Sequence, residues 1–208
     1  MTPDQFNLVF CVFLLLSLSV QWLLSIRQIR WISQHRAAVP VGFEEHVTLS
    51  SHQQGADYTL TKTRFGLLTQ TFNALLLVCW TVMGGLNELN EVIRTHLAPW
   101  GPIVYQLGLV VGVSLINGLL DLPFEWWSTF KIEQSFGFNR TTPALFISDR
   151  VKGVLIGAAI GLPLLSLLLW LVQIAGPQWW LWGFGVWAAF NLLLMVIFPI
   201  WIAPLFNK

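Results

Sequence analysis

Long runs of apolar residues, separated by shorter polar stretches, divide the chain into five segments. A helix needs about 20 mostly apolar residues to cross the hydrocarbon core of a bilayer. Each of the five segments meets that requirement, so the pattern predicts an all-α, multi-pass membrane protein with five transmembrane helices. The expected spans are residues 6–26, 67–86, 102–120, 151–175 and 179–202.

Composition agrees with a membrane protein. Only 10% of the 208 residues are charged and 55% are hydrophobic, whereas a soluble domain carries about 25% charged residues. The net charge of +1 gives no reason to expect a nucleic-acid partner. No basic residue precedes the first apolar run and no small-residue cleavage motif follows it, so we expect an uncleaved first span rather than a signal peptide.

The basic residues predict the orientation in the membrane, because Lys and Arg concentrate in cytoplasmic loops. If the chain alternates between the two sides, all but one of them fall on the same side, and Arg94 is the exception. We therefore expect the N-terminus outside and the C-terminus in the cytoplasm, in a bacterial inner membrane or an endoplasmic reticulum membrane. The residues expected on the cytoplasmic side are Arg27, Arg30, Arg36, Lys62, Arg64, Lys131, Arg140, Arg150, Lys152 and Lys208.

Two long inner loops, residues 27–66 and 121–150, follow from this topology, and the outer connections 87–101 and 176–178 are short. Residues 55–66 are expected to extend the second span into the cytoplasm as a helix. The sequence DLPFEWWSTFKIEQSF predicts a further helix in the second loop, with Pro123 at its start.

In that second-loop helix, Glu125, Thr129 and Glu133 are expected on one face. The letters GFN at 137–139 end it, because glycine favours backbone angles that helices do not use. Thr142 and Pro143 then start the next helix as its cap and first residue.

Few residues suggest chemistry. None of the four histidines belongs to an H-E-x-x-H zinc motif, and His46 and His52 are six residues apart, which does not place them on one helix face. The spans hold almost no ionisable residues away from their ends, which argues against an ion-coupled transporter. The asparagines in the spans, Asn73, Asn117 and Asn191, are expected to form hydrogen bonds between helices.

The polar loop carries a more specific signal. The sequence DLPFEWWSTFKIEQSFGFNRTTPALFISDRVKG (121–153) resembles the signature of the N-terminal domain of type I CAAX prenyl proteases, and ADYTLTKTRFG (56–66) and IAPLFNK (202–208) resemble two further segments of that family. The matching positions in the loop are Leu122, Pro123, Phe124, Trp127, Thr129, Phe130, Ile132, Glu133, Gly137, Phe138, Asn139, Thr142, Asp149 and Lys152.

The resemblance implies a multi-span zinc endopeptidase whose helices form a barrel around an intramembrane chamber. In that family, zinc is bound beyond the fifth span by H-E-x-x-H and a later glutamate, and none of these ligands lies within the present chain. We therefore expect the 208 residues to be the chamber-forming N-terminal membrane domain, part of a larger helical barrel and not catalytic alone, with no metal bound here. The alternative is a non-catalytic membrane scaffold or a channel-like protein.

Partners and site residues follow from the same resemblance. The expected partners are the lipid bilayer, a C-terminal catalytic half that contains the zinc, and a substrate that is a prenylated C-terminal peptide or a membrane-associated protein. No catalytic residue is assigned in this chain. The residues expected to shape the chamber loop, or to brace the catalytic half, are Pro123, Glu133, Gly137, Phe138, Asn139 and Asp149.

Overall fold

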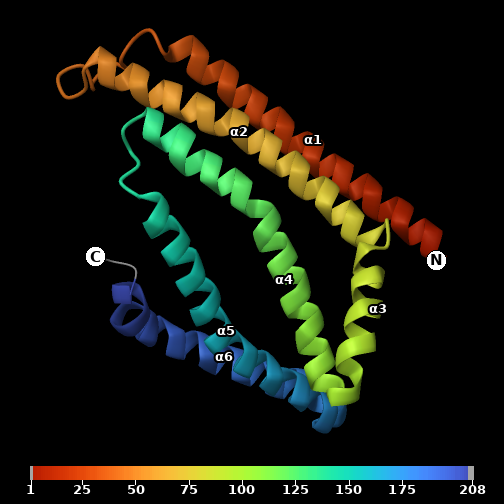
Figure 1. Ribbon diagram of the computed structural model, residues 1–208. Coiled ribbons are helices and arrows are strands. Elements are labelled where there is room, and N and C mark those ends of the chain that lie inside the picture. The colour runs from red at the N-terminus through yellow and green to blue at the C-terminus, as the bar shows by residue number, and fades with distance from the viewer. Residues whose placement is uncertain (1, 206–208) are drawn as a thin grey trace. The chain divides into compact units, whose positions relative to one another are not determined.

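Residues 2–205 are described by a computed structural model, and that part of the chain is helical with no β-strand (Figure 1). The α-helices are α1 (Pro3–His35), α2 (Leu49–Thr81), α3 (Gly85–Leu97), α4 (Pro102–Trp127), α5 (Pro143–Ile174) and α6 (Trp179–Ile197). Short 3₁₀ or π turns connect or extend them: η1 (Ala98–Trp100), η2 (Ser128–Glu133), η3 (Gly176–Gln178), η4 (Phe198–Ile202) and η5 (Ala203–Leu205).

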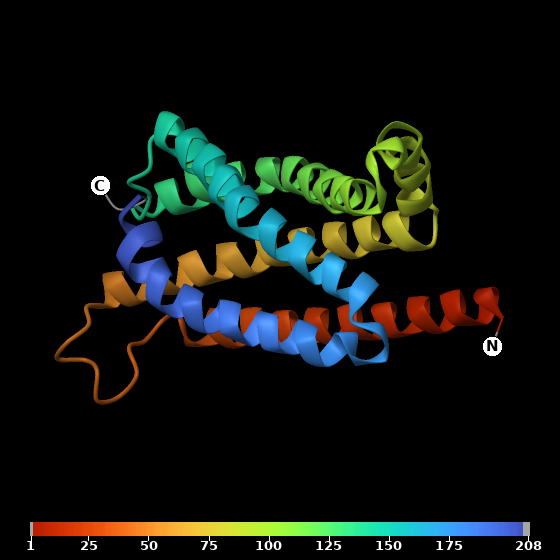
Figure 2. The same cartoon turned by 90° about the horizontal axis from the view of Figure 1, so that it is seen from below.

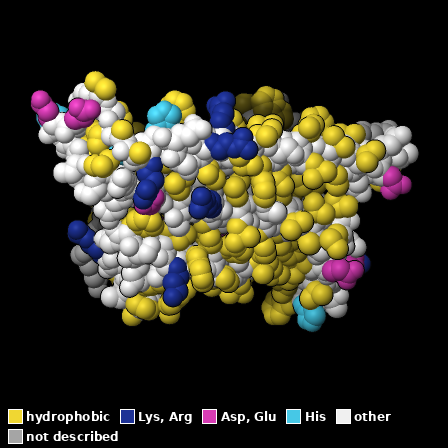
Figure 3. All heavy atoms as spheres, turned by 90° about the horizontal axis from the view of Figure 1, so that it is seen from above, with side chains coloured by type: hydrophobic (Ala, Val, Ile, Leu, Met, Phe, Trp, Pro, Cys, Tyr) yellow, Lys and Arg dark blue, Asp and Glu magenta, His cyan; other side chains and the backbone are white. Residues whose placement is uncertain are grey.

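Membrane-spanning capacity is shared by most of these helices. Four segments are long and apolar enough to cross a bilayer: α1, α4 with η2, α5, and residues 176–205. The pair α2 and α3 passes the same test as one broken span, which brings the number to five. Large hydrophobic side chains remain exposed along all of them, and Figure 3 shows a continuous area of such side chains on one face. Such a surface is stable against lipid rather than against water.

The helices group into two compact units, Met1–Glu91 with Val113–Arg140, and Val92–Gly112 with Thr141–Lys208. In the first unit, α1 and α2 lie side by side and are joined by the connection 36–48 (Figures 1 and 2). Arg36 closes this hairpin with two hydrogen bonds, each 2.6 Å long, to the carboxylate of Asp57. Farther along α2, the indole N–H of Trp80 donates to the side-chain oxygen of Asn117 in α4, at 2.8 Å. This is the inter-helix bond expected for an asparagine in a span.

The second unit contains the α5–α6 pair, connected by η3. Thr142 caps α5 as expected, because its hydroxyl accepts from the N–H of Leu145 at 3.2 Å and Pro143 occupies the first turn. Asn191 differs from the expectation, since its amide donates to the carbonyl of Trp187 in its own helix.

The structure corrects two expectations about connections. Residues 87–97, expected in the outer connection 87–101, belong to helix α3. Pro123 does not start a new helix, because it lies inside α4, which runs on from the third predicted span. An uninterrupted helix is favoured there because backbone groups in or near a membrane must be hydrogen-bonded within the chain. Phe206, Asn207 and Lys208, which include the last basic residue used for the orientation, lie outside the described residues.

Candidate functional site

The polar loop after α4 begins with η2, a π-helical turn over Ser128–Glu133. The turn ends where the N–H of Phe138 donates to the carbonyl of Glu133 at 2.9 Å and the N–H of Gly137 donates to that of Gln134 at 3.1 Å. Gly137 has φ of +77°, in the left-handed region that side chains with a β-carbon avoid. The glycine therefore reverses the chain there, as expected from the sequence.

Helix α2 holds this turn through aromatic contacts. The ring of Tyr58 meets the ring of Phe136 edge-on, with centroids 5.4 Å apart, and the ring of Phe138 at 4.9 Å. One turn earlier, the side-chain amide of Gln54 donates to the carbonyl of Phe136 at 3.1 Å. Edge-to-face ring pairs stabilise a contact by about 0.5–1.5 kcal/mol beyond the area they bury. The turn is thus held against α2 by ring contacts and by a hydrogen bond to one of its backbone carbonyls.

An ion pair completes the contact. The ammonium of Lys62 lies 3.6 Å from the Glu133 carboxylate and donates to the Tyr58 hydroxyl at 2.9 Å. The pKa of Lys62, which precedes the predicted second span, is raised first by the Tyr58 hydroxyl and less by Glu133. Tyr58, Lys62, Glu133, Phe136 and Phe138 are called the α2–turn cluster below.

The core beside this cluster is small and apolar. Among residues 2–205, only Leu60, Ile132 and Ile202 are buried. Leu60 lies in α2 between Tyr58 and Lys62, and Ile132 lies in η2 next to Glu133. The buried positions of the first unit therefore fall where α2 meets η2.

The expected site residues fall into separate places. Glu133, Gly137, Phe138 and Asn139 lie together in the turn, and the backbone N–H of Asn139 donates to the carbonyl of Glu133 at 3.3 Å. Glu133 pairs with Lys62 of α2. Pro123 lies in α4.

Asp149 belongs to the second unit, where it lies 3.3 Å from Lys152 one turn later in α5. The ammonium of Lys152 also donates to the carbonyl of Leu205 at 3.3 Å. The aspartate of the motif is therefore part of a connection between α5 and the end of the described chain, not of the α2–turn cluster.

Sequence reasoning missed Tyr58 and Lys62 as partners of the turn. Their spacing of four residues places both on one face of a helix, which was a usable signal. The sequence contains no signal for which residues of the turn they contact, because a single sequence does not pair residues 71 or more positions apart. The bidentate Arg36–Asp57 pair was missed as well, because a single sequence does not show which residues meet across a connection, even 21 positions apart.

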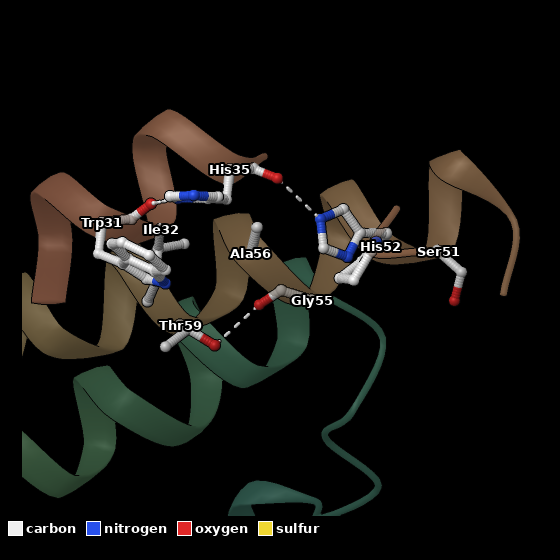
Figure 4. Close-up of a pocket in the computed structure, with 9 residues that line it drawn as sticks. Trp31, Ile32, His35, Ser51, His52, Gly55, Ala56 and Thr59 are labelled. Carbon is white, nitrogen blue, oxygen red and sulfur yellow. Dashed lines mark hydrogen bonds between the residues drawn. The ribbon is translucent and has the colours of Figure 1, made fainter. Parts of the chain in front are cut away.

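A groove of about 610 Å³ opens on the α1–α2 hairpin (Figure 4). Its lining includes Trp31 and His35, whose rings stack with centroids 3.8 Å apart, and His52, whose Nε2 lies 3.1 Å from the carbonyl oxygen of His35. Two histidines do not make a metal site without a further ligand. Among residues 2–205, no three His, Cys, Asp or Glu side chains are grouped so as to hold a metal ion. The described part of the chain thus has no site that fits zinc.

Comparison with known proteins adds three findings. Residues 28–208 match the protein family described as CAAX prenyl protease N-terminal, five membrane helices. The chain is 32% identical over 188 residues to a CAAX prenyl protease 1 homolog of Oryza sativa subsp. japonica, covering 85% of this chain and 44% of that protein. It is 30% identical over 210 residues to a homolog from Dictyostelium discoideum, covering 94% of this chain and 46% of that protein.

A solved structure is also similar in fold. The crystal structure of Ste24p from S. mikatae matches with a TM-score of 0.91 at 24% sequence identity, over 100% of this chain and 49% of that chain. The present chain therefore spans about half the length of the proteins it resembles.

Proposed function

Because this chain belongs to the CAAX prenyl protease N-terminal family, which has five membrane helices, we propose that it forms the membrane-chamber part of an integral-membrane zinc endopeptidase. The observation that carries the proposal is the match of residues 28–208 to that family. The proposed substrates are prenylated C-terminal peptides or other membrane-associated proteins.

Catalysis is proposed to depend on a region outside these 208 residues. A zinc hydrolase needs protein ligands and an open coordination position for water. The described residues hold no group that fits this requirement, so we assign them no step of the hydrolysis. Their proposed tasks are to enclose the substrate and to position the catalytic region.

The polar loop is proposed to perform the second of these tasks. Glu133, Gly137, Phe138 and Asn139 lie in a turn that α2 holds by aromatic contacts and by the Lys62–Glu133 pair. A turn fixed in this way offers a firm surface for another part of the protein. Pro123 in α4, and Asp149 in α5 of the second unit, are proposed to help brace the catalytic region or shape substrate entry, each from its own helix.

The protein is proposed to cross the membrane with its N-terminus outside and its C-terminus in the cytoplasm. The charge bias of the loops supports this orientation. It places the α2–turn cluster at the cytoplasmic face of a bacterial inner membrane or an endoplasmic reticulum membrane.

The deciding experiment compares two forms of the protein in detergent with a fluorogenic peptide that ends in a prenylated cysteine motif. The protein isolated at its native length is expected to cleave the peptide, to lose activity on chelation and to regain it with Zn²⁺. The 208-residue chain alone is expected to show no cleavage. If the native-length protein is inactive with zinc bound and with both prenylated and unprenylated peptides, the endopeptidase proposal is wrong and a scaffold or channel-like role takes its place.

A further inference from the structure

The α1–α2 hairpin carries five Lys and Arg side chains, and they differ in whether an acidic group compensates them. Two are paired: Arg36 bonds to Asp57, and the ammonium of Lys62 lies 3.6 Å from the Glu133 carboxylate. The other three are exposed, and among residues 2–205 none of them forms an ion pair. These three, called the hairpin arginines below, are Arg27 and Arg30 in α1 and Arg64 in α2.

The register of the hairpin places these arginines at nearly one depth. The two helices run antiparallel, and Gln21 of α1 lines the same groove as Gln70 of α2. Arg27 lies six residues beyond Gln21 and Arg64 lies six residues before Gln70, so these two arginines are level. Arg30 lies one helical turn farther, about 4.5 Å at 1.5 Å per residue. The three positive charges therefore form a narrow band across the hairpin.

This band lies at the level expected for lipid head groups. Arg27 directly follows the predicted span 6–26, and Arg64 lies three residues before the predicted span 67–86. On the span side of the band, apolar side chains are exposed, among them Leu23 at 67% and Leu68 at 58%. Figure 3 shows Lys and Arg side chains gathered beside an apolar area on one face. The band thus borders a surface that contacts acyl chains.

The hairpin supplies no anion of its own to this band. Its helices contain only two acidic residues, Asp4 near the N-terminus and Asp57, which Arg36 holds. Arginine presents a rigid fork of N–H donors that matches phosphate oxygens. The missing anion therefore comes from outside the hairpin, and a phosphate group fits the donors.

The neighbouring apolar side chains indicate that this phosphate belongs to a lipid. A soluble anion would contact the arginines alone, whereas a phospholipid would also place its acyl chains along the exposed leucines. Trp31, which is 64% exposed beside Arg30, agrees with this level, because tryptophan favours the membrane–water interface.

We propose that the hairpin arginines bind the head groups of anionic phospholipids, with the acyl chains lying along the apolar side chains of α1 and α2. With the orientation proposed above, these lipids belong to the cytoplasmic leaflet. The inference goes beyond the peptidase function and does not depend on it.

The test measures lipid binding by fluorescence anisotropy on the native-length protein in detergent micelles. The probes are phosphatidylglycerol and phosphatidylcholine with the same fluorophore on one acyl chain, so that only the head group differs. The unsubstituted protein is expected to bind phosphatidylglycerol more tightly. Arg30→Gln and Arg64→Gln are each expected to raise the Kd for phosphatidylglycerol about fivefold, the effect of one basic residue near an anionic membrane surface. Neither is expected to change the Kd for phosphatidylcholine.

Three controls separate a lipid site from a general effect of charge. Arg140→Gln removes an exposed arginine of the polar loop, outside α1 and α2, and is expected to leave both Kd values unchanged. Arg30→Lys keeps the charge and is expected to retain most of the preference for phosphatidylglycerol. Inorganic phosphate in excess over the lipid is expected not to displace the probe.

Equal Kd values for the two lipids, or a phosphatidylglycerol Kd that neither Arg30→Gln nor Arg64→Gln changes, would overturn the proposal. An equal loss in Arg140→Gln would show diffuse attraction instead of a site, and displacement by phosphate would show a site for soluble anions. Cleavage of the prenylated peptide by a protein without lipid preference would defeat the lipid site and leave the proposed function standing. Lipid preference without cleavage would do the reverse.

Discussion

At Gly137 the absence of a β-carbon determines how the chain leaves η2. A β-carbon built there would meet no atom within 4 Å, so the space around the glycine is open. Any cost of substitution thus comes from the backbone angle, φ of +77°, rather than from a clash. The same reasoning does not apply to Gly66 in α2, which has equally open space but no positive φ.

We predict that Gly137→Ala lowers the free energy of unfolding by about 1–2 kcal/mol, the cost of the left-handed conformation for a residue with a side chain. Gly137→Asn is expected to lose less, since asparagine tolerates that region. Thermal unfolding in detergent measures both. Gly66→Ala serves as the control and is expected to be neutral or stabilising by up to about 1 kcal/mol; equal losses at positions 66 and 137 would refute the backbone explanation.

Asp57 gives a pH-dependent prediction. The hydrogen bonds from Arg36 lower the pKa of this carboxyl below its usual 3.8, and both residues lie outside the predicted spans. Since the folded pKa is the lower one, the pair stabilises the fold above pH 3.8 and this contribution is lost as the pH falls through the lowered value. We predict that Asp57→Asn reduces the melting temperature at pH 7 and that the difference from the unsubstituted protein shrinks below pH 3.8.

Melting curves of a second variant test whether the two-bond geometry of the Arg36–Asp57 pair matters. Arg36→Lys keeps the charge but not the two parallel N–H groups, so it is expected to lie between the unsubstituted protein and Asp57→Asn. A difference for Asp57→Asn that persists undiminished at low pH would mean that the carboxylate charge is not its cause.

At the scale of elements, the Trp80–Asn117 bond connects α2 to α4 across the first unit. Hydrogen bonds between membrane helices stabilise by about 0.6 kcal/mol on average. We predict a coupling energy of about that size in a double-mutant cycle of Trp80→Phe and Asn117→Leu, measured by unfolding in mixed micelles. Asn191 bonds only within its own helix among the contacts described; a cycle of Trp80→Phe with Asn191→Leu is the control, and similar coupling in both cycles would contradict the prediction.

Most helices could be predicted from the sequence because a membrane span has a strong signal, a run of about 20 apolar residues. The cap at Thr142 and the helix end at Gly137 could also be predicted, since capping and a positive φ each require particular residue types. Helix α3 could not, because Gly85–Leu97 is polar and too short to resemble a span. The π-helical form of Ser128–Glu133 was missed as well, since its residues fit an α-helical pattern.

At the scale of the whole molecule, the distribution of charge gives the clearest test. In a protein with Cys11 and Cys79 replaced by alanine, single cysteines at exposed positions report the side of the membrane. We predict that Glu44→Cys reacts with a membrane-impermeant maleimide only from the cytoplasmic side, and that Gln178→Cys, in the predicted outer connection 176–178, reacts only from the other side. The reverse pattern, or labelling of both from one side, would show that the charge bias does not set the orientation.

The π-helical turn η2 has a consequence for sequence length. A π turn contains one more residue than the α-helical turn it replaces, so residues 128–133 behave like a one-residue insertion in a helix. Deletion of a single residue there would restore α-helical winding and rotate everything beyond it by about 100°. Glu133 would then turn away from Lys62, and Phe136 and Phe138 away from Tyr58. A relative whose loop is shorter by this one residue would therefore have to hold its turn with different partners on α2.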